Sequence, residues 1–108
     1  MIVRFFLSSL FLISVSGIAL SQPSDDVERG RMLAEQQCSE CHAVDHVDRL
    51  APELQGASFY EIANTPGMTP LALSVWFKTP HREMPNFILP QQTQDDLIAF
   101  IESLREAK

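Results

Sequence analysis

The chain has 108 residues with eight Lys or Arg and fourteen Asp or Glu, which gives a formal net charge of −6. This length allows one domain. Because nucleic acid would repel an acidic chain without a basic patch, we do not expect nucleic acid among its partners. The sequence also contains neither repeats nor a low-complexity tract, which excludes a repeat architecture.

The first 21 residues have the composition of an export signal. Arg4 gives a weakly positive start, an apolar run follows over Phe5–Leu20, and the Ala-Leu-Ser that ends at Ser21 places small residues where signal peptidase reads. The alternative is an uncleaved membrane anchor. The run of about 16 residues is, however, shorter than the roughly 20 that a helix needs to span a bilayer. We therefore predict a signal peptide over 1–21, a mature domain over 22–108, a periplasmic location and no stable membrane insertion.

The expected mature domain is small and strongly acidic. Removing 21 of the 108 residues leaves 87, with seven basic and fourteen acidic side chains and a net charge of −7. A chain of this size buries only a small core, so we expect a staple or a bound group to support it. Its charge predicts partners with a basic docking surface, to which binding weakens as salt rises.

The residues Cys38-Ser39-Glu40-Cys41-His42 form the C-x-x-C-H pattern of c-type haem attachment. Two thiols one helical turn apart can each add across a vinyl group of the same porphyrin, and the next imidazole can then reach the iron. The pattern predicts one covalent haem c, attached through Cys38 and Cys41, with His42 as an iron ligand. A thioredoxin-like redox motif and half of a zinc site are the alternatives. The chain has no βαβ pattern and no other cysteines to support either of them.

Periodicity and capping residues predict an all-α fold. A first helix is expected over about 26–37, following good N-cap residues. Gly30 within it costs about 1 kcal/mol relative to Ala, which suggests that a second helix comes close there. A short helix is expected over 58–63, with Phe59 and Ile62 on its inner side.

Two further helices are predicted in the second half of the chain. One covers about 69–78, begins with a Thr-Pro capping pair, and has Leu71 and Val75 among its apolar residues. The last covers about 93–106, with its first residue, a threonine, as N-cap and Asp96 at the capping-box position. No segment alternates as a strand would, so we predict three to five short helices joined by Pro-rich loops. The apolar positions of the last helix are Leu97, Ile98, Phe100, Ile101 and Leu104.

The second axial ligand decides what a haem bound by His42 could do. A thioether is neutral and soft, and it raises the reduction potential. Met84 is favoured because it lies in a loop well after the haem motif, with Pro85 restricting its backbone to an extended form. Met68, His81 and an open position are the alternatives.

Taken together, these motifs resemble those of small bacterial class I cytochromes c. The likeness covers nearly all of the predicted mature chain and depends on the order and spacing of its parts. It implies a monohaem, His/Met-ligated cytochrome c fold whose first and last helices cross near Gly30 and Phe100 around the covalent haem. The parts are Gly30, Cys38-Ser39-Glu40-Cys41-His42, Ala51-Pro52-Glu53-Leu54-Gln55-Gly56, Met84-Pro85 and Asp96-Leu97-Ile98-Ala99-Phe100-Ile101.

The resemblance also assigns roles around the haem. The Pro52 carbonyl would accept a hydrogen bond from Nδ1 of His42, which orients the imidazole and raises its basicity. Leu54 would pack on the haem, while Phe59 and Trp76 would line the pocket or meet a propionate. The loop between the haem motif and the methionine is shorter than in mitochondrial-type members. The surface is acidic rather than ringed by lysines, so their partners do not carry over.

The expected function is electron transfer rather than enzymatic catalysis. With both axial positions filled, no substrate binds the iron, and the protein would shuttle single electrons between larger redox proteins through small, transient interfaces. One alternative is a dedicated electron-transfer subunit of a periplasmic dehydrogenase or oxidase. Others are a haem-based ligand sensor or peroxidase-like protein, if Met84 is labile, and a haem-free thiol–disulfide protein.

Overall fold

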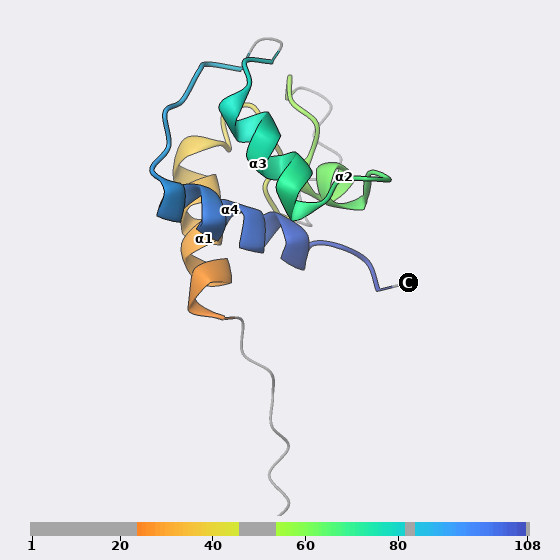
Figure 1. Ribbon diagram of the computed structural model, residues 1–108. Helices are drawn as coiled ribbons and strands as arrows, with labels where there is room; N and C mark the ends of the chain where they lie inside the picture. The colour runs from red at the N-terminus through yellow and green to blue at the C-terminus, as the bar shows by residue number, and fades with distance from the viewer. Residues whose placement is uncertain (1–23, 46–53, 82–83, 108) are drawn as a thin grey trace, which may run out of the picture.

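The computed structural model describes residues 24–45, 54–81 and 84–107, and within them it shows four helices and no strand (Figure 1). The prediction of an all-α fold with three to five short helices is therefore confirmed for this part of the chain. None of the described helices is both long enough and apolar enough to cross a membrane. The predicted signal peptide over 1–21 lies outside the described residues. The helices are α1 (Asp25–Gln37), α2 (Phe59–Asn64), α3 (Pro70–Lys78) and α4 (Gln91–Ser103).

Helices α1 and α4 cross in direct backbone contact (Figure 1). A Cβ atom on Gly30 would lie 2.0 Å from the carbonyl oxygen of Asp96 and 2.7 Å from Cβ of Phe100. Only a hydrogen atom fits in that space, which explains a glycine in the middle of a helix. The expected contact between the first and last helices near Gly30 and Phe100 is present.

An ion pair lies beside this contact. Arg29 donates to the Asp96 carboxylate with both Nε and Nη2, at 3.0 and 2.9 Å, and Gln92 Nε2 donates to it at 3.0 Å. Hydrogen bonding from Arg29, and to a lesser extent from Gln92, lowers the pKa of the Asp96 carboxyl from its ordinary value, although burial opposes this shift. Asp96 therefore joins the two helices through a bidentate pair.

The start of α4 differs from the prediction. The helix begins at Gln91 with Pro90 as its N-cap, so the prediction of Thr93 as N-cap was wrong. Pro90 has an extended backbone (φ −54°, ψ 149°), and its carbonyl accepts from the amide of Gln94 at 3.1 Å. The carboxylate of Asp96 is drawn across to Arg29 on α1 and plays no part in a capping box.

The core forms where α4 packs against the other three helices. The predicted apolar side of α4 is confirmed, because all of its positions are buried or half-buried. Each large apolar side chain that is fully buried stabilises the fold by about 1.5–3 kcal/mol. The buried cluster consists of Ala34, Val44, Phe59, Ala63, Leu73, Leu97, Phe100, Ile101 and Leu104.

Helix α3 begins as predicted, whereas α2 begins one residue later than predicted, with Ser58 as its N-cap. Ser58 and Glu61 form a reciprocal capping box at α2, with backbone-to-side-chain bonds of 3.1 and 3.0 Å. Thr69 Oγ1 accepts from the third residue of α3 at 3.1 Å, and a proline occupies the first position of that helix. The buried residue of α3 is Leu73, however, whereas Leu71 is 74% exposed. The orientation of α3 was therefore not evident from its apolar residues.

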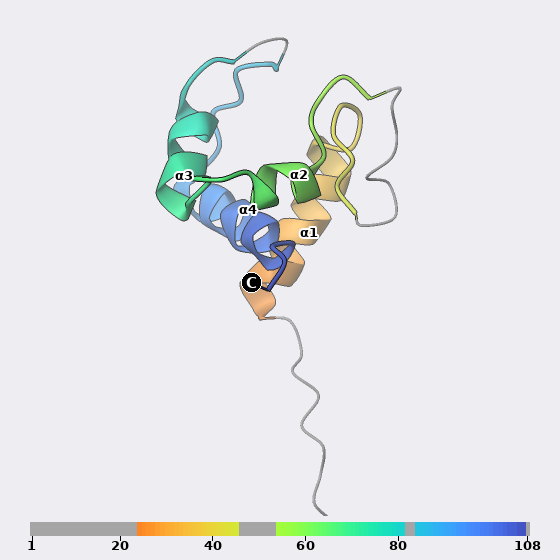
Figure 2. The same ribbon diagram turned by 90° about the vertical axis from the view of Figure 1, so that its right-hand side faces the viewer.

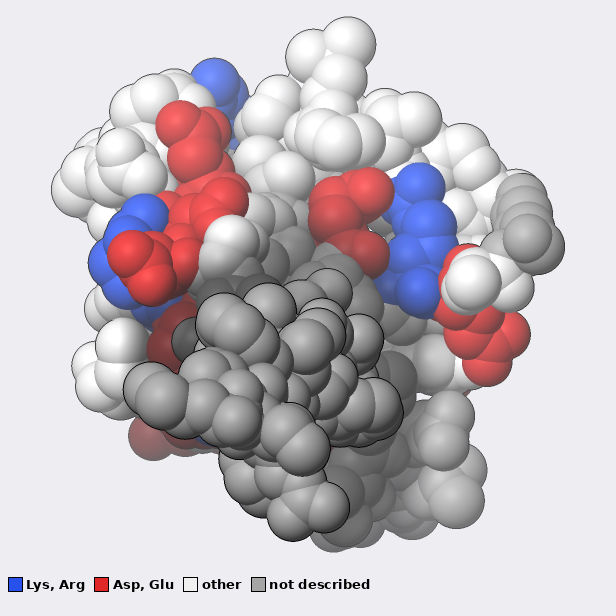
Figure 3. Space-filling view, turned by 90° about the horizontal axis from the view of Figure 1, so that it is seen from below, with Lys and Arg blue, Asp and Glu red and all other residues white. Residues whose placement is uncertain are grey.

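Charge is distributed unevenly over the fold. Acidic and basic side chains adjoin one another in groups on the underside of the molecule (Figure 3). Between positions 62 and 94, by contrast, the sequence has only three charged side chains, those of Lys78, Arg82 and Glu83. This stretch includes α3 and the described part of the loop that leads to α4, and large apolar side chains are exposed on it. These side chains are Leu71, Val75, Trp76, Phe87 and Ile88.

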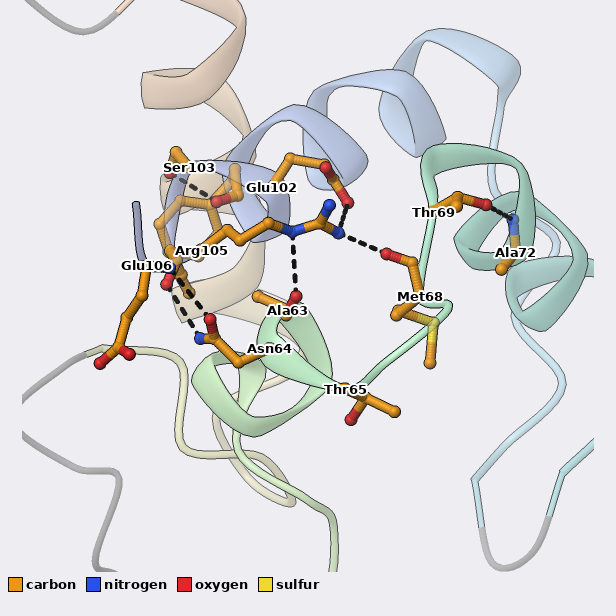
Figure 4. Close-up of polar contacts among 12 residues, drawn as sticks. Ala63, Asn64, Thr65, Met68, Thr69, Ala72, Glu102, Ser103, Arg105 and Glu106 are labelled. Carbon is orange, nitrogen blue, oxygen red and sulfur yellow. Dashed lines mark hydrogen bonds and ion pairs between the residues drawn. The ribbon is translucent and has the colours of Figure 1, made fainter. Parts of the chain in front are cut away.

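The C-terminal residues tie α2 to α4 (Figure 4). Arg105 donates from Nε to the carbonyl of Ala63 at 3.1 Å and from Nη2 to the carbonyl of Met68. The amide of Glu106 donates to Oδ1 of Asn64 at 2.9 Å. Because Ala63 and Asn64 lie at the end of α2, these bonds satisfy or cover groups that a helix C-terminus leaves unpaired.

Candidate functional site

The C-x-x-C-H motif of Cys38, Cys41 and His42 forms the turn that follows α1. Cys38 is the C-cap of the helix, and its carbonyl accepts from the amides of Cys41 and His42 at 3.1 and 2.9 Å. The chain thus makes one further tight turn, which brings the two cysteines next to one another in the backbone. Both thiols are free and half-buried. The spacing on which two attachments to one porphyrin depend is present.

The position of the motif argues against a redox-active dithiol. Burial raises the pKa of the Cys38 thiol, which favours the protonated form. Reactive C-x-x-C thiols instead have a lowered pKa, often because they stand at the N-terminus of a helix. Here the motif follows the C-terminus of α1, where the helix dipole disfavours a thiolate.

The imidazole of His42 is held from a segment that lies later in the chain. Its Nδ1–H donates to the carbonyl of Ala57 at 2.7 Å. The ring centroid of Phe59 lies 5.4 Å from that of the imidazole. This hydrogen bond places the proton on Nδ1 and leaves Nε2 as the nitrogen that can bind a metal. No described residue hydrogen-bonds to Nε2 of His42.

Backbone bonds hold the two segments together around His42. The amide of Gly56 donates to the carbonyl of Cys41 at 2.7 Å, and the amide of Phe59 donates to that of Ala43 at 2.9 Å. A Cβ on Gly56 would lie 2.5 Å from both Cε1 and Nδ1 of the His42 ring. The glycine therefore forms a cradle for the ring. Sequence reasoning missed this role, for which the only signal was the glycine that ends the 51–56 segment.

Two of the predicted residues of this segment need separate mention. Pro52 lies outside the described residues, and the acceptor that the structure gives to Nδ1 of His42 is Ala57 rather than Pro52. Any role of Pro52 stays a prediction. Leu54 is half-buried, and its contact with a haem also stays a prediction.

Met84 lies on the other side of the site, in the stretch between α3 and α4. It is half-buried, and it lines a small open pocket together with Trp76, His81 and Phe87. The amide of Met84 donates to the carbonyl of His81 at 3.2 Å. Met68, the other methionine considered as a ligand, packs against the core cluster instead.

The two halves of the site face the same end of the fold. Figure 2 shows the turn after α1 and the loop before α4 on the same side of α4, separated across the view. The donors are therefore arranged as two sets. One set consists of Cys38, Cys41 and His42, and the other consists of Met84 and His81. Among the described residues, no group of three or more His, Cys, Asp or Glu could hold a metal ion.

None of the family models, curated proteins or solved structures compared with the chain matches it. What the site can do follows from its own donors. The paired thiols can form thioether bonds, an imidazole with a free Nε2 can bind iron, and a thioether can bind the opposite face. These four donors, two thiols, an imidazole and a thioether, fit a covalent haem, and the space that Gly56 leaves for the His42 ring is part of this fit. No further protein donor is required.

Proposed function

We propose that this protein is a periplasmic c-type cytochrome that carries single electrons. One haem c would be attached through Cys38 and Cys41 and bound at its iron by His42 and Met84. The observation that carries the proposal is the way in which the imidazole of His42 is positioned. Its ring directly follows two thiols on one turn, its Nδ1 is tied to the Ala57 carbonyl, and its Nε2 is left to bind a metal.

Each residue has a separate task in this proposal. The two cysteines anchor the group, so that its position does not depend on packing alone. The hydrogen bond to Ala57 orients His42 and raises its basicity, while Gly56 leaves room for the ring. When bound, the haem supplies an iron that gains and loses one electron. The neutral thioether of Met84 favours the reduced state.

The arrangement of helices supports the finer proposal of a cytochrome c fold. Helix α4 packs on α1 at Gly30, and α2 and α3 both pack on α4. The motif turn and the Met84 loop extend from this frame toward the same side of α4 (Figure 2). A rigid frame suits an electron carrier, because small structural change on oxidation keeps the barrier to transfer low.

The proposed partners are redox proteins with a basic docking surface. The acidic side chains of the chain would steer such partners at long range, and this effect weakens with salt. The protein would transfer electrons without catalysing a reaction of its own. The proposal includes export through the predicted signal peptide over 1–21.

A second candidate is a dedicated electron-transfer subunit of a larger periplasmic dehydrogenase or oxidase. The observation that favours it is the exposed apolar surface between α2 and α4, where Leu71 is 74% exposed and Ile88 is 94% exposed. Permanent interfaces are more apolar than transient ones. Co-purification of a larger protein that withstands high salt would favour the subunit, and release by salt would favour the free carrier.

The proposal is tested by expressing the full chain together with haem-attachment machinery. We expect a red protein whose colour survives denaturation and extraction with acid and organic solvent, and a colourless product when both cysteines are replaced by Ala. The ferric protein should show the weak red absorption band of a Met–iron bond. Met84→Leu should abolish this band, and the matched variant Met68→Leu should keep it. Extractable haem, or a band that depends on Met68, would contradict the proposal.

A further inference from the structure

A second histidine in the described chain is held by the same kinds of contact as His42. Nδ1–H of His81 donates to the carbonyl of Thr79 at 3.0 Å. The Trp76 ring meets the imidazole edge-on, with centroids 5.2 Å apart and planes at 87°. As at His42, the bond to a backbone carbonyl places the proton on Nδ1 and leaves Nε2 as the metal-binding nitrogen.

His81 and Met84 occupy the same pocket. Both line it, and the amide of Met84 donates to the carbonyl of His81 at 3.2 Å. Between α3 and α4 the chain thus offers two different donors, a borderline imidazole and a soft thioether. The turn after α1 offers one donor for the iron, His42.

We propose that His81 is a second distal ligand, whose Nε2 binds the haem iron when Met84 leaves it. This inference rests on the proposed function, because it requires the covalent haem. In the exchange, the bond from iron to the Met84 sulfur breaks and a bond from iron to Nε2 of His81 forms. Imidazole and thioether both bind as neutral groups, so the exchange itself would transfer no electron. In both forms the iron would have one ligand from the stretch between α3 and α4, and a position would be free only while one ligand replaces the other.

The exchange would change the reduction potential without refolding the protein. Imidazole stabilises ferric iron more than a thioether does, so the form bound by two histidines would have the lower potential. Both donors lie between the end of α3 at Lys78 and the start of α4 at Gln91. None of the described residues of that stretch belongs to the buried cluster or to the α1–α4 contact at Gly30, so the exchange would leave both in place.

The test uses the full haem-loaded protein and three variants, Met84→Ala, His81→Asn and the double variant. We expect His81→Asn to keep the wild-type spectrum with its Met–iron band. Met84→Ala should be low-spin in the ferric state, by absorption and electron paramagnetic resonance, with a lowered midpoint potential. The double variant should be high-spin and should return to low spin when imidazole is added. Carbon monoxide should bind ferrous Met84→Ala at least about tenfold more slowly than the double variant, since only molecules with a free iron position bind it.

Two outcomes would overturn the inference. One is a high-spin Met84→Ala that binds carbon monoxide as fast as the double variant. The other is a low-spin Met84→Ala that is unchanged by adding His81→Asn, because another residue would then be the ligand. If Met84→Ala does not fold, Met84→Leu keeps the volume and allows the same comparison. Haem that is extractable from the wild-type protein contradicts the proposed function itself, so the two failures are distinguishable.

Discussion

The α1–α4 crossing and the donor site are held together by different kinds of contact. At the crossing, backbone meets backbone at Gly30, and a buried carboxylate is paired across the helices. At the site, the donors are half-buried side chains, and the imidazoles of His42 and His81 are held by one hydrogen bond each to a carbonyl. The first region leaves no room for change, whereas the second orients its groups and leaves them accessible. Stability and chemistry should therefore respond to different substitutions.

The largest effect on stability is expected from Gly30→Ala. The added Cβ would lie 2.0 Å from the Asp96 carbonyl oxygen, which is backbone and cannot turn away. Alanine gains about 1 kcal/mol of helix propensity, but forcing the helices apart costs more, and we expect a net loss of at least about 2 kcal/mol. Denaturant unfolding measures it.

Gly67→Ala is the matched control for Gly30→Ala. Gly67 has no atom within 4 Å of a Cβ position, and its φ is 81°. Its replacement should therefore cost only about 1 kcal/mol of backbone strain. Equal losses at the two glycines would show that the crossing is not the tight contact that its geometry indicates.

Gly56→Ala should change the site more than the stability. Its Cβ would meet Cε1 and Nδ1 of the His42 ring at 2.5 Å and the backbone carbonyl oxygen of Cys41 at 2.8 Å. The ring can swing aside, whereas the Cys41 carbonyl can move only with the turn that carries it. We expect a loss of about 1 kcal/mol in stability and a broken bond from His42 to Ala57. Nitrogen NMR of the haem-free protein would show the imidazole losing its single Nδ1–H tautomer. An unchanged tautomer would mean that Gly56 does not position the ring.

Asp96→Asn should affect stability in a pH-dependent way. The folded-state pKa of Asp96 is lowered, chiefly by hydrogen bonding from Arg29. The carboxylate therefore stabilises the fold above its unfolded pKa of about 3.9, and this contribution is lost as the pH falls through the lower folded value. Denaturation midpoints from pH 7 to pH 2 should converge for wild type and Asp96→Asn at the acid end. Parallel curves would show that the pair contributes nothing that titrates.

The smallest effect is expected from Arg105→Ala. Arg105 ties the end of α2 and the following turn to the C-terminal segment, and its side chain is partly exposed (Figure 4). We expect a loss of about 0.5 kcal/mol, measured by thermal or denaturant unfolding, with no change in the proposed Met–iron band. Arg31→Ala is the control, because Arg31 contacts only Glu28 and Glu35 of its own helix in the described structure. A larger effect at Arg31 would contradict the role of the C-terminal tie.

Local features of the chain were predictable because each depends on residues a few positions apart. The Thr-Pro start of α3 and the limits of α1 both follow from such spacing. The haem motif belongs to the same kind, since its two cysteines lie within one turn. The apolar side of α4 was readable because its periodicity runs over several turns.

The tertiary structure decided which residues meet across the chain. Periodicity could not tell that α3 buries Leu73 while Leu71 is exposed, because apolar residues occur on both sides of that short helix. Helix α4 begins at Gln91 because a proline precedes it, and its Asp96 pairs with Arg29 rather than capping. The contact of Ala57 with His42 depends on how the 54–59 segment folds back on the motif. The amino-acid sequence predicted that the described chain is helical and roughly where each helix lies, because helix limits depend on local hydrogen bonding and spacing. The partners of each helix were decided by packing, because a hydrogen bond or a close approach between distant residues exists only once the helices have crossed.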